Sequence, residues 1–65
     1  MRKVHYYVVA YCEIEKMRSS QSFVVTGEEQ LAVGINDLIS QKLKKLKIQI
    51  HRLTAEEIKE GGWNI

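Results

Sequence analysis

The hydrophobic and polar positions of residues 4–14 predict a β-strand that is apolar or aromatic on both faces. One set of alternate positions holds Val4, Tyr6, Val8, Ala10, Cys12 and Ile14. The other set holds His5, Tyr7, Val9, Tyr11 and Glu13. Successive side chains of a strand point to opposite faces of a sheet, so each set occupies one face. A small chain can cover one such face with its own helix, and the second face needs another cover, a partner or a ligand.

A second strand is predicted after a polar stretch at residues 15–20, which we interpret as a hairpin loop. Residues 21–26 alternate again, with Phe23 and Val25 on one face and Ser22, Val24 and Thr26 on the other. The loop is too short for a parallel crossover, so the two strands are expected to pair antiparallel.

An amphipathic helix is predicted over residues 28–45. The sequence from Thr26 to Glu29 matches a capping box, in which the Thr26 side chain caps the helix and Glu29 reaches back. Apolar residues then recur at spacings of three and four, namely Leu31, Ala32, Ile35, Leu38, Ile39, Leu43 and Leu46. Gly34 costs about 1 kcal/mol relative to alanine inside a helix, so we expect it to permit close packing of the helix on the sheet.

Period-two alternation returns at residues 47–53 and predicts a third strand, with Ile48 and Ile50 inward and Gln49 and His51 outward. Residues 54–57 repeat the capping-box pattern and start a short helical turn. Gly61 and Gly62 then end that turn. The segment 61–65 is interpreted as a frayed tail, a short edge strand, or an apolar hook that packs Trp63 on the core or on a neighbour.

The predicted fold is therefore a single α+β domain spanning residues 1–65. Its order is β-β-α-β, with a mainly antiparallel three-stranded sheet in the order 2-1-3, one long helix on one face and a C-terminal helical turn. Below roughly 70–80 residues a single core rarely supplies more than about 3–5 kcal/mol. Cys12 is the only cysteine, so no disulfide forms within the chain, and no metal-ligand spacing or cofactor motif occurs. Oligomerisation or docking on a partner remains as the additional source of stability.

Composition and charge exclude several classes of protein. Hydrophobic residues make up 45% and charged residues 28% of the chain, which is ordinary for a folded domain. The net charge of +2 does not by itself indicate a nucleic-acid partner. No run approaches the roughly 20 apolar residues of a membrane helix, and no signal-peptide cleavage site is found. We expect a cytoplasmic protein without membrane contact, in agreement with its lone thiol.

The second face of the first strand is the main candidate for a binding surface. Its predicted partner-binding residues are His5, Tyr7, Val9, Tyr11, His51 and Trp63. An alternative is that the tyrosines stack the bases of a nucleic acid. Its phosphates would then contact Lys42, Lys44, Lys45, Lys47 and Arg52. A simpler interpretation places the lysines at a helix C-terminus, where cations complement the helix dipole. In this interpretation the tyrosines only contact the aliphatic parts of lysine side chains.

Catalysis is not expected. The carboxylates of the chain that could act as catalytic groups lie near predicted helix starts, where acidic side chains complement the helix dipole. They are Glu28, Glu29, Glu56, Glu57 and Glu60. Cys12 and His5 are on opposite faces of one strand, which disfavours a nucleophile pair or a metal site. We predict a small non-enzymatic interaction module that forms a homodimer or binds a larger protein, with weak nucleic-acid binding as the alternative. In size and element order the chain resembles small accessory proteins of phages, prophages and plasmids.

Overall fold

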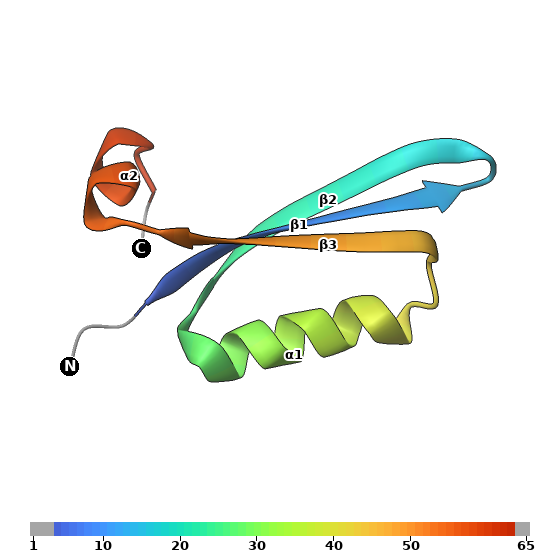
Figure 1. Ribbon diagram of the computed structural model, residues 1–65, viewed down its shortest axis with the longest axis horizontal. Coiled ribbons are helices and arrows are strands. Elements are labelled where there is room, and N and C mark those ends of the chain that lie inside the picture. Colours follow the sequence, from blue (N-terminus) through green and yellow to red (C-terminus); the bar gives the residue numbers. More distant parts are fainter. Residues whose placement is uncertain (1–3, 64–65) are drawn as a thin grey trace.

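The computed structural model describes residues 4–63 and confirms the predicted α+β architecture (Figure 1). The elements in chain order are β1 (His5–Ile14), β2 (Met17–Thr26), α1 (Gly27–Ser40), β3 (Lys44–Leu53) and α2 (Ala55–Glu60). Positions 64 and 65 of the predicted C-terminal segment lie outside the described residues.

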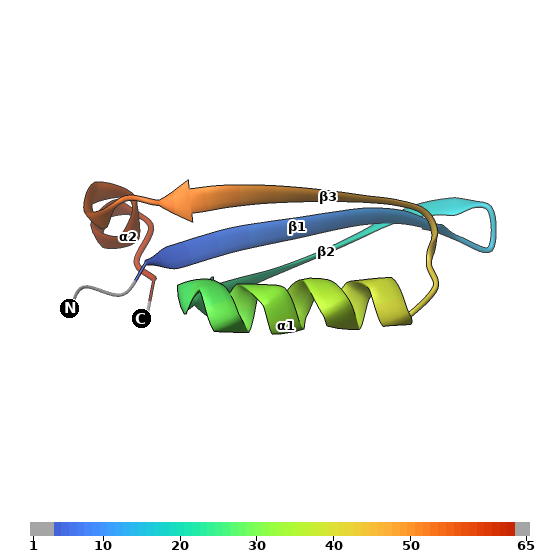
Figure 2. The ribbon, with the colours of Figure 1, turned by 60° about the horizontal axis from the view of Figure 1, so that its bottom comes forward.

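The sheet has the predicted order β2-β1-β3, and β1 pairs antiparallel with both neighbours. Figure 2 shows α1 along one side of this twisted sheet, with the short α2 at one end. In the register, Val8 lies between Phe23 and Ile50 on the core face, which carries α1. Tyr7 lies between Val24 and His51 on the opposite side, which we name the outer face. The assignment of alternate β1 residues to two faces is thereby confirmed.

The core forms where α1 crosses the middle of the sheet. Val8 and Ala10 of β1 are fully buried against Leu38 of α1. Partly buried side chains surround them, namely Tyr6, Phe23, Val25, Leu31, Leu46 and Ile48. A Cβ atom built at Gly34 would lie 2.8 Å from Cε2 of Phe23. The absence of a side chain at Gly34 therefore allows the predicted close packing of helix on sheet.

The hairpin that joins β1 and β2 is tighter than predicted. Glu15 and Lys16 form a turn of two residues with φ of 50° and 66°, as type I′ turns require at both central positions. The strand β2 therefore begins at Met17, and the prediction of a loop over residues 15–20 is wrong. The polar side chains of this segment belong to a solvent-facing edge strand, which looks like a loop by composition.

The predicted end of α1 is also wrong, because the helix stops at Ser40 instead of residue 45. Lys42 has a φ of 52°, a left-handed conformation typical of a helix end, and its amide donates to the Ile39 carbonyl at 3.1 Å. Leu46 contacts the core from β3 instead of from the helix. It fits both patterns, because it continues the helical spacing and also alternates with Ile48. Pairing of β3 with β1 decides between the two.

This correction changes the interpretation of the lysines. The last turn of α1 holds no basic residue. The interpretation that the lysines belong to the end of the helix is therefore wrong for Lys44, Lys45 and Lys47, which belong to β3, whereas Lys42 directly follows the C-cap Gln41. Lys45 instead has a φ of 54° beside a β-bulge, where β3 shifts its register opposite Tyr11 and Glu13.

The two predicted capping boxes have different outcomes. At Thr54 both bonds are present: the Glu57 amide donates to Thr54 Oγ1 at 3.1 Å, and the Thr54 amide donates to Glu57 Oε1 at 3.2 Å. At Thr26 the prediction is wrong, since the side chain makes no cap bond. Thr26 stays in sheet register with His5, whose Nδ1 lies 2.9 Å from Thr26 Oγ1. The Thr26 amide donates to Gln30 Oε1 at 2.9 Å, so Gln30 takes the role expected of Glu29.

Candidate functional site

One end of the outer face is covered by the chain's own C-terminal segment. The ring centroids of Tyr7 and Trp63 are 5.5 Å apart at a tilt of 53°. His51 Nε2 lies 2.6 Å from Glu57 Oε2. Leu53, which pairs with His5 on this face, is only 8% exposed. We name this the covered end, where Trp63 and the start of α2 reach back to the outer face through these contacts, and Trp63 itself stays 37% exposed.

Two glycines position Trp63 for this contact. Gly62 has a φ of 66°, which L side chains rarely adopt, and turns the chain back after α2. A Cβ atom built at Gly61 would lie 2.5 Å from Nε1 of Trp63, so this glycine leaves room for the indole. The Trp63 amide donates to the Ile58 carbonyl at 3.3 Å. Of the three interpretations of residues 61–65, the described part fits an apolar hook.

Electrostatics support the docking of α2. Hydrogen bonds from the His51 ring and then from the Thr54 amide lower the pKa of the Glu57 carboxyl below its ordinary value. The carboxylate form is favoured because both donors stabilise its negative charge. Glu57 thus joins the start of α2 to the outer face of β3.

The remaining part of the outer face is open. Tyr11 is 43% exposed and lies between Ser20 and Lys47 in the register. A hollow of about 670 Å³ on this face is lined by Tyr7, Val9, Tyr11, Gln49, Ile50 and His51. The structure therefore brings four of the predicted partner-binding residues into one hollow, with Trp63 packed on Tyr7 beside it.

His5 is separate from that hollow. It bonds Thr26 and lines another hollow with Leu53 and Ile58, at the start of β1. It lies opposite Leu53, whereas His51 lies opposite Tyr7, so the two histidines are not cross-strand partners. Cys12 is buried. No group of three or more metal-ligating side chains gathers within residues 4–63.

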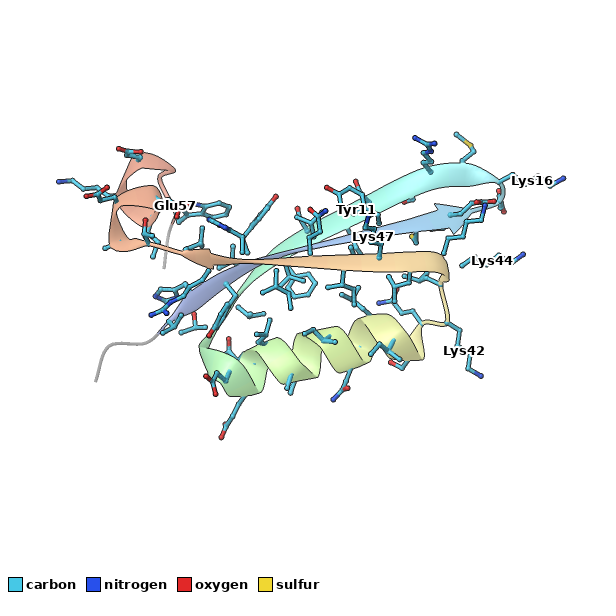
Figure 3. All side chains as sticks on the ribbon, in the orientation of Figure 1. Tyr11, Lys16, Lys42, Lys44, Lys47 and Glu57 are labelled. Carbon is cyan, nitrogen blue, oxygen red and sulfur yellow. The ribbon has the colours of Figure 1, made fainter. Side chains whose placement is uncertain are left out.

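Basic side chains gather at the hairpin end of the molecule. We name this region the basic end, formed by Lys16, Arg18, Lys42, Lys44, Lys45 and Lys47. Figure 3 shows Lys16, Lys42 and Lys44 at the end of the molecule away from Glu57, with Lys47 near Tyr11. The antiparallel direction of β3 explains this clustering, because its first residues lie beside the β1–β2 turn.

The sequence pattern predicts only part of the basic end. Lys16 and Arg18 were not expected beside the lysines of residues 42–47, although antiparallel pairing brings these segments together. Arg52 was grouped with these lysines, whereas the structure places Arg52 opposite Tyr6 near α2. A hollow of about 500 Å³ at the basic end is lined by Tyr11, Cys12, Glu13, Arg18, Ser19, Lys45 and Lys47. Within it, Lys45 Nζ lies 3.0 Å from Glu13 Oε2.

The core face has a feature that the sequence did not reveal. The helix α1 packs mainly on β1 and β2 and leaves β3 largely uncovered. Ile50 of β3 is consequently 47% exposed, although its partner Val8 on the same face is fully buried. Ile39 of α1 is 57% exposed. On the other side of α1, a groove of about 560 Å³ against β2 is lined in part by Phe23 and Val33.

Comparisons with known proteins find no relative: the chain matches no protein-family model, no curated protein and no solved structure. Among the helices of residues 4–63, none is long and apolar enough to cross a membrane. The fold and these surfaces define a small α+β domain with an uncovered edge strand and a basic, partly aromatic sheet surface.

Proposed function

We propose that this protein is a small non-enzymatic interaction module that self-associates along the edge strand β3. The observation that carries the proposal is the exposure of Ile50 beside the fully buried Val8. Ile50 faces the core side of the sheet but remains about half exposed to solvent. The hydrophobic core of the monomer is therefore incomplete beside β3. A chain of this size gains most from completing such a core with another copy.

The edge of β3 provides the backbone groups for this association. In the sheet formed by residues 4–63, β3 pairs with β1 on one side and has no strand on the other. Unpaired amide and carbonyl groups of an edge strand can accept a further strand. A second copy that pairs its own β3 there extends the sheet across a two-fold axis. The Ile50 side chains of the two copies then approach on the core face. Each is already about half buried, so completing its burial contributes about half of the roughly 1.5–3 kcal/mol of a full isoleucine in each copy.

Charge selects the antiparallel arrangement. The strand β3 begins with Lys44 and Lys45 and leads into α2, which carries Glu56 and Glu60. Antiparallel pairing places the basic start of one β3 beside the acidic α2 of the other copy. Parallel pairing would align lysine with lysine, and lysines on an edge strand oppose such contacts. The resulting interface is isologous, as in most homodimers.

The covered end of the outer face is assigned a structural role in this proposal, because α2 and Trp63 already occupy it. The module works in the reducing cytoplasm, where the buried thiol of Cys12 stays free. The proposal includes a role as a small accessory protein of a phage or prophage, a class that the chain resembles in size and element order.

Sedimentation equilibrium over a range of concentrations tests the proposal. The wild-type mass should rise from monomer to dimer with concentration, and Ile50→Lys should weaken the dimer about 10- to 100-fold. The matched control is Val33→Lys, which adds the same charge to an apolar side chain that is 60% exposed on the β2 side of α1. A wild-type monomer up to millimolar concentration contradicts the proposal, as does an equal effect of the two variants.

A charge exchange tests the orientation of the two strands. Lys44→Glu should weaken the dimer about 2- to 20-fold, and adding Glu56→Lys should restore it. If the double variant does not regain the dimer affinity of the wild type, the antiparallel arrangement is excluded. The role of Ile50 is tested separately by Ile50→Lys.

A further inference from the structure

The open part of the outer face places an exposed aromatic ring next to the basic end. From this juxtaposition we infer that single-stranded nucleic acid binds there, with phosphates at Arg18 and Lys47 and bases on Tyr11. This inference goes beyond self-association, which depends on Ile50 and the edge of β3, whereas the proposed track is centred on Tyr11 and Arg18 of β1 and β2; Ile50 lines the Tyr7 end of the track, and Lys47 belongs to β3.

The charge distribution supports a phosphate-binding surface. Carboxylates at the hairpin end are Glu13 and Glu15, fewer than the basic side chains there, and Glu13 is engaged by Lys45. The net charge of the whole chain is only +2. The other acidic residues lie mainly at the start of α1 and on α2, namely Glu28, Glu29, Glu56, Glu57 and Glu60. The basic end is therefore much more positive than the overall composition suggests, and a local cation excess attracts a polyanion.

Tyr11 is placed to stack a base. It is 43% exposed, and its cross-strand neighbours Ser20 and Lys47 present no ring to it. Within residues 4–63 the aromatic pair found is Tyr7 with Trp63, so Tyr11 retains its stacking capacity. Base–aromatic stacking on an exposed sheet surface is a common mode of single-strand recognition.

Two hollows share Tyr11 in their lining, and together we name them the track. The hollow of about 500 Å³ contains Arg18, Lys45 and Lys47, and the hollow of about 670 Å³ extends along β1 to Val9 and Tyr7. Tyr7 and Tyr11 are separated by about 13 Å along an extended strand, at roughly 3.3 Å per residue. The track therefore offers phosphate contacts at one end and an apolar, aromatic floor for bases at the other. A duplex does not fit this arrangement, because its bases are already stacked on one another.

Fluorescence anisotropy with labelled 12-mers of oligothymidylate and oligouridylate tests this inference. At about 50 mM salt the wild-type protein should bind at least one of them. Tyr11→Ala should weaken binding about 5- to 100-fold, and Tyr11→Phe should retain it because the ring remains. Lys47→Gln should weaken binding and reduce the salt slope by about 1. Lys59→Gln on α2 is the matched control and should leave both unchanged, with folding of all variants verified by circular dichroism.

Several results would overturn the inference. They are absence of binding to both oligomers, equal affinity for a duplex or for inorganic polyphosphate, and equal effects of Lys47→Gln and Lys59→Gln. A preference for oligouridylate or oligothymidylate assigns the track to RNA or to DNA, and comparable affinities support a site that does not read the sugar. The solution mass of Tyr11→Ala, measured in parallel, should match that of the wild type. A loss of nucleic-acid binding can then be distinguished from a loss of self-association.

Discussion

The two ends of the outer face are built on the same three strands and differ in what lies on them. At the covered end, Tyr7 packs on Trp63, His51 bonds Glu57, and Leu53 is buried. At the open end, Tyr11 is exposed between Ser20 and Lys47. In Figure 3 Glu57 and the lysines of the hairpin end lie at opposite ends of the molecule.

This comparison separates two tyrosines that the sequence pattern treats as equivalent. Tyr7 and Tyr11 occupy alternate positions on the same face of one strand. The C-terminal segment returns far enough to reach Tyr7, so that tyrosine contributes to the fold. Tyr11 is left exposed, so it is the one available to a partner or ligand. An aromatic strand face therefore indicates a binding surface only where no other part of the chain covers it.

The largest expected effect contrasts a buried residue at the covered end with a residue at the open end. Leu53→Ala removes a buried side chain, and such changes cost about 2–5 kcal/mol of unfolding free energy. Val9→Ala, on the same face but only half-buried, should cost less than about 1.5 kcal/mol. Urea denaturation followed by circular dichroism measures both. Equal losses would show that α2 does not make the covered end better packed than the open end.

A smaller effect is expected when Trp63 alone is displaced. Gly61→Ala introduces a Cβ 2.5 Å from the indole Nε1, so the ring must move away from Tyr7. The lost aromatic contact corresponds to about 0.5–1.5 kcal/mol, and the emission of this single tryptophan should shift to longer wavelength. The control is Gly62→Asn, since a Cβ at Gly62 meets no atom within 4 Å and asparagine tolerates its φ of 66°. An unchanged spectrum for Gly61→Ala would mean that the indole is not held against Tyr7.

The sequence was sufficient to predict element types, strand order and the covering of one face by α1. Those features follow from alternation at Val8 and Ala10 and from the helical spacing around Leu38. The end of α1 was not predictable in this way, because Leu46 fits both a helical and an alternating pattern. The turn at Glu15 and Lys16 was missed because neither residue is a glycine or asparagine, which usually provide positive φ.

The candidate sites were predicted less completely, for a physical reason. The basic end depends on which strand ends lie side by side in the sheet. The covered end depends on where the segment after β3 contacts the outer face. Pairing of Lys47 with Tyr11, and contact of Trp63 with Tyr7, join residues far apart in the chain. The exposure of Ile50 depends on the lateral offset of α1 over the sheet, which periodicity within one element does not encode.

The smallest expected effect concerns the ionisation of Glu57 at the covered end. Its carboxyl pKa is lowered in the fold by the hydrogen bonds from His51 and Thr54. A lowered pKa means that the stabilisation is complete above the pKa of the unfolded chain, about 4.3, and is lost as the pH falls through the lower value of the folded protein. Tryptophan emission and helical circular dichroism should therefore change together in this acidic range. Glu57→Gln should remove the transition, whereas Glu60→Gln, on the same helix, should retain it. A transition of equal size in both variants would assign the acid sensitivity to other carboxylates and leave the covered end held by Leu53 and Trp63 alone.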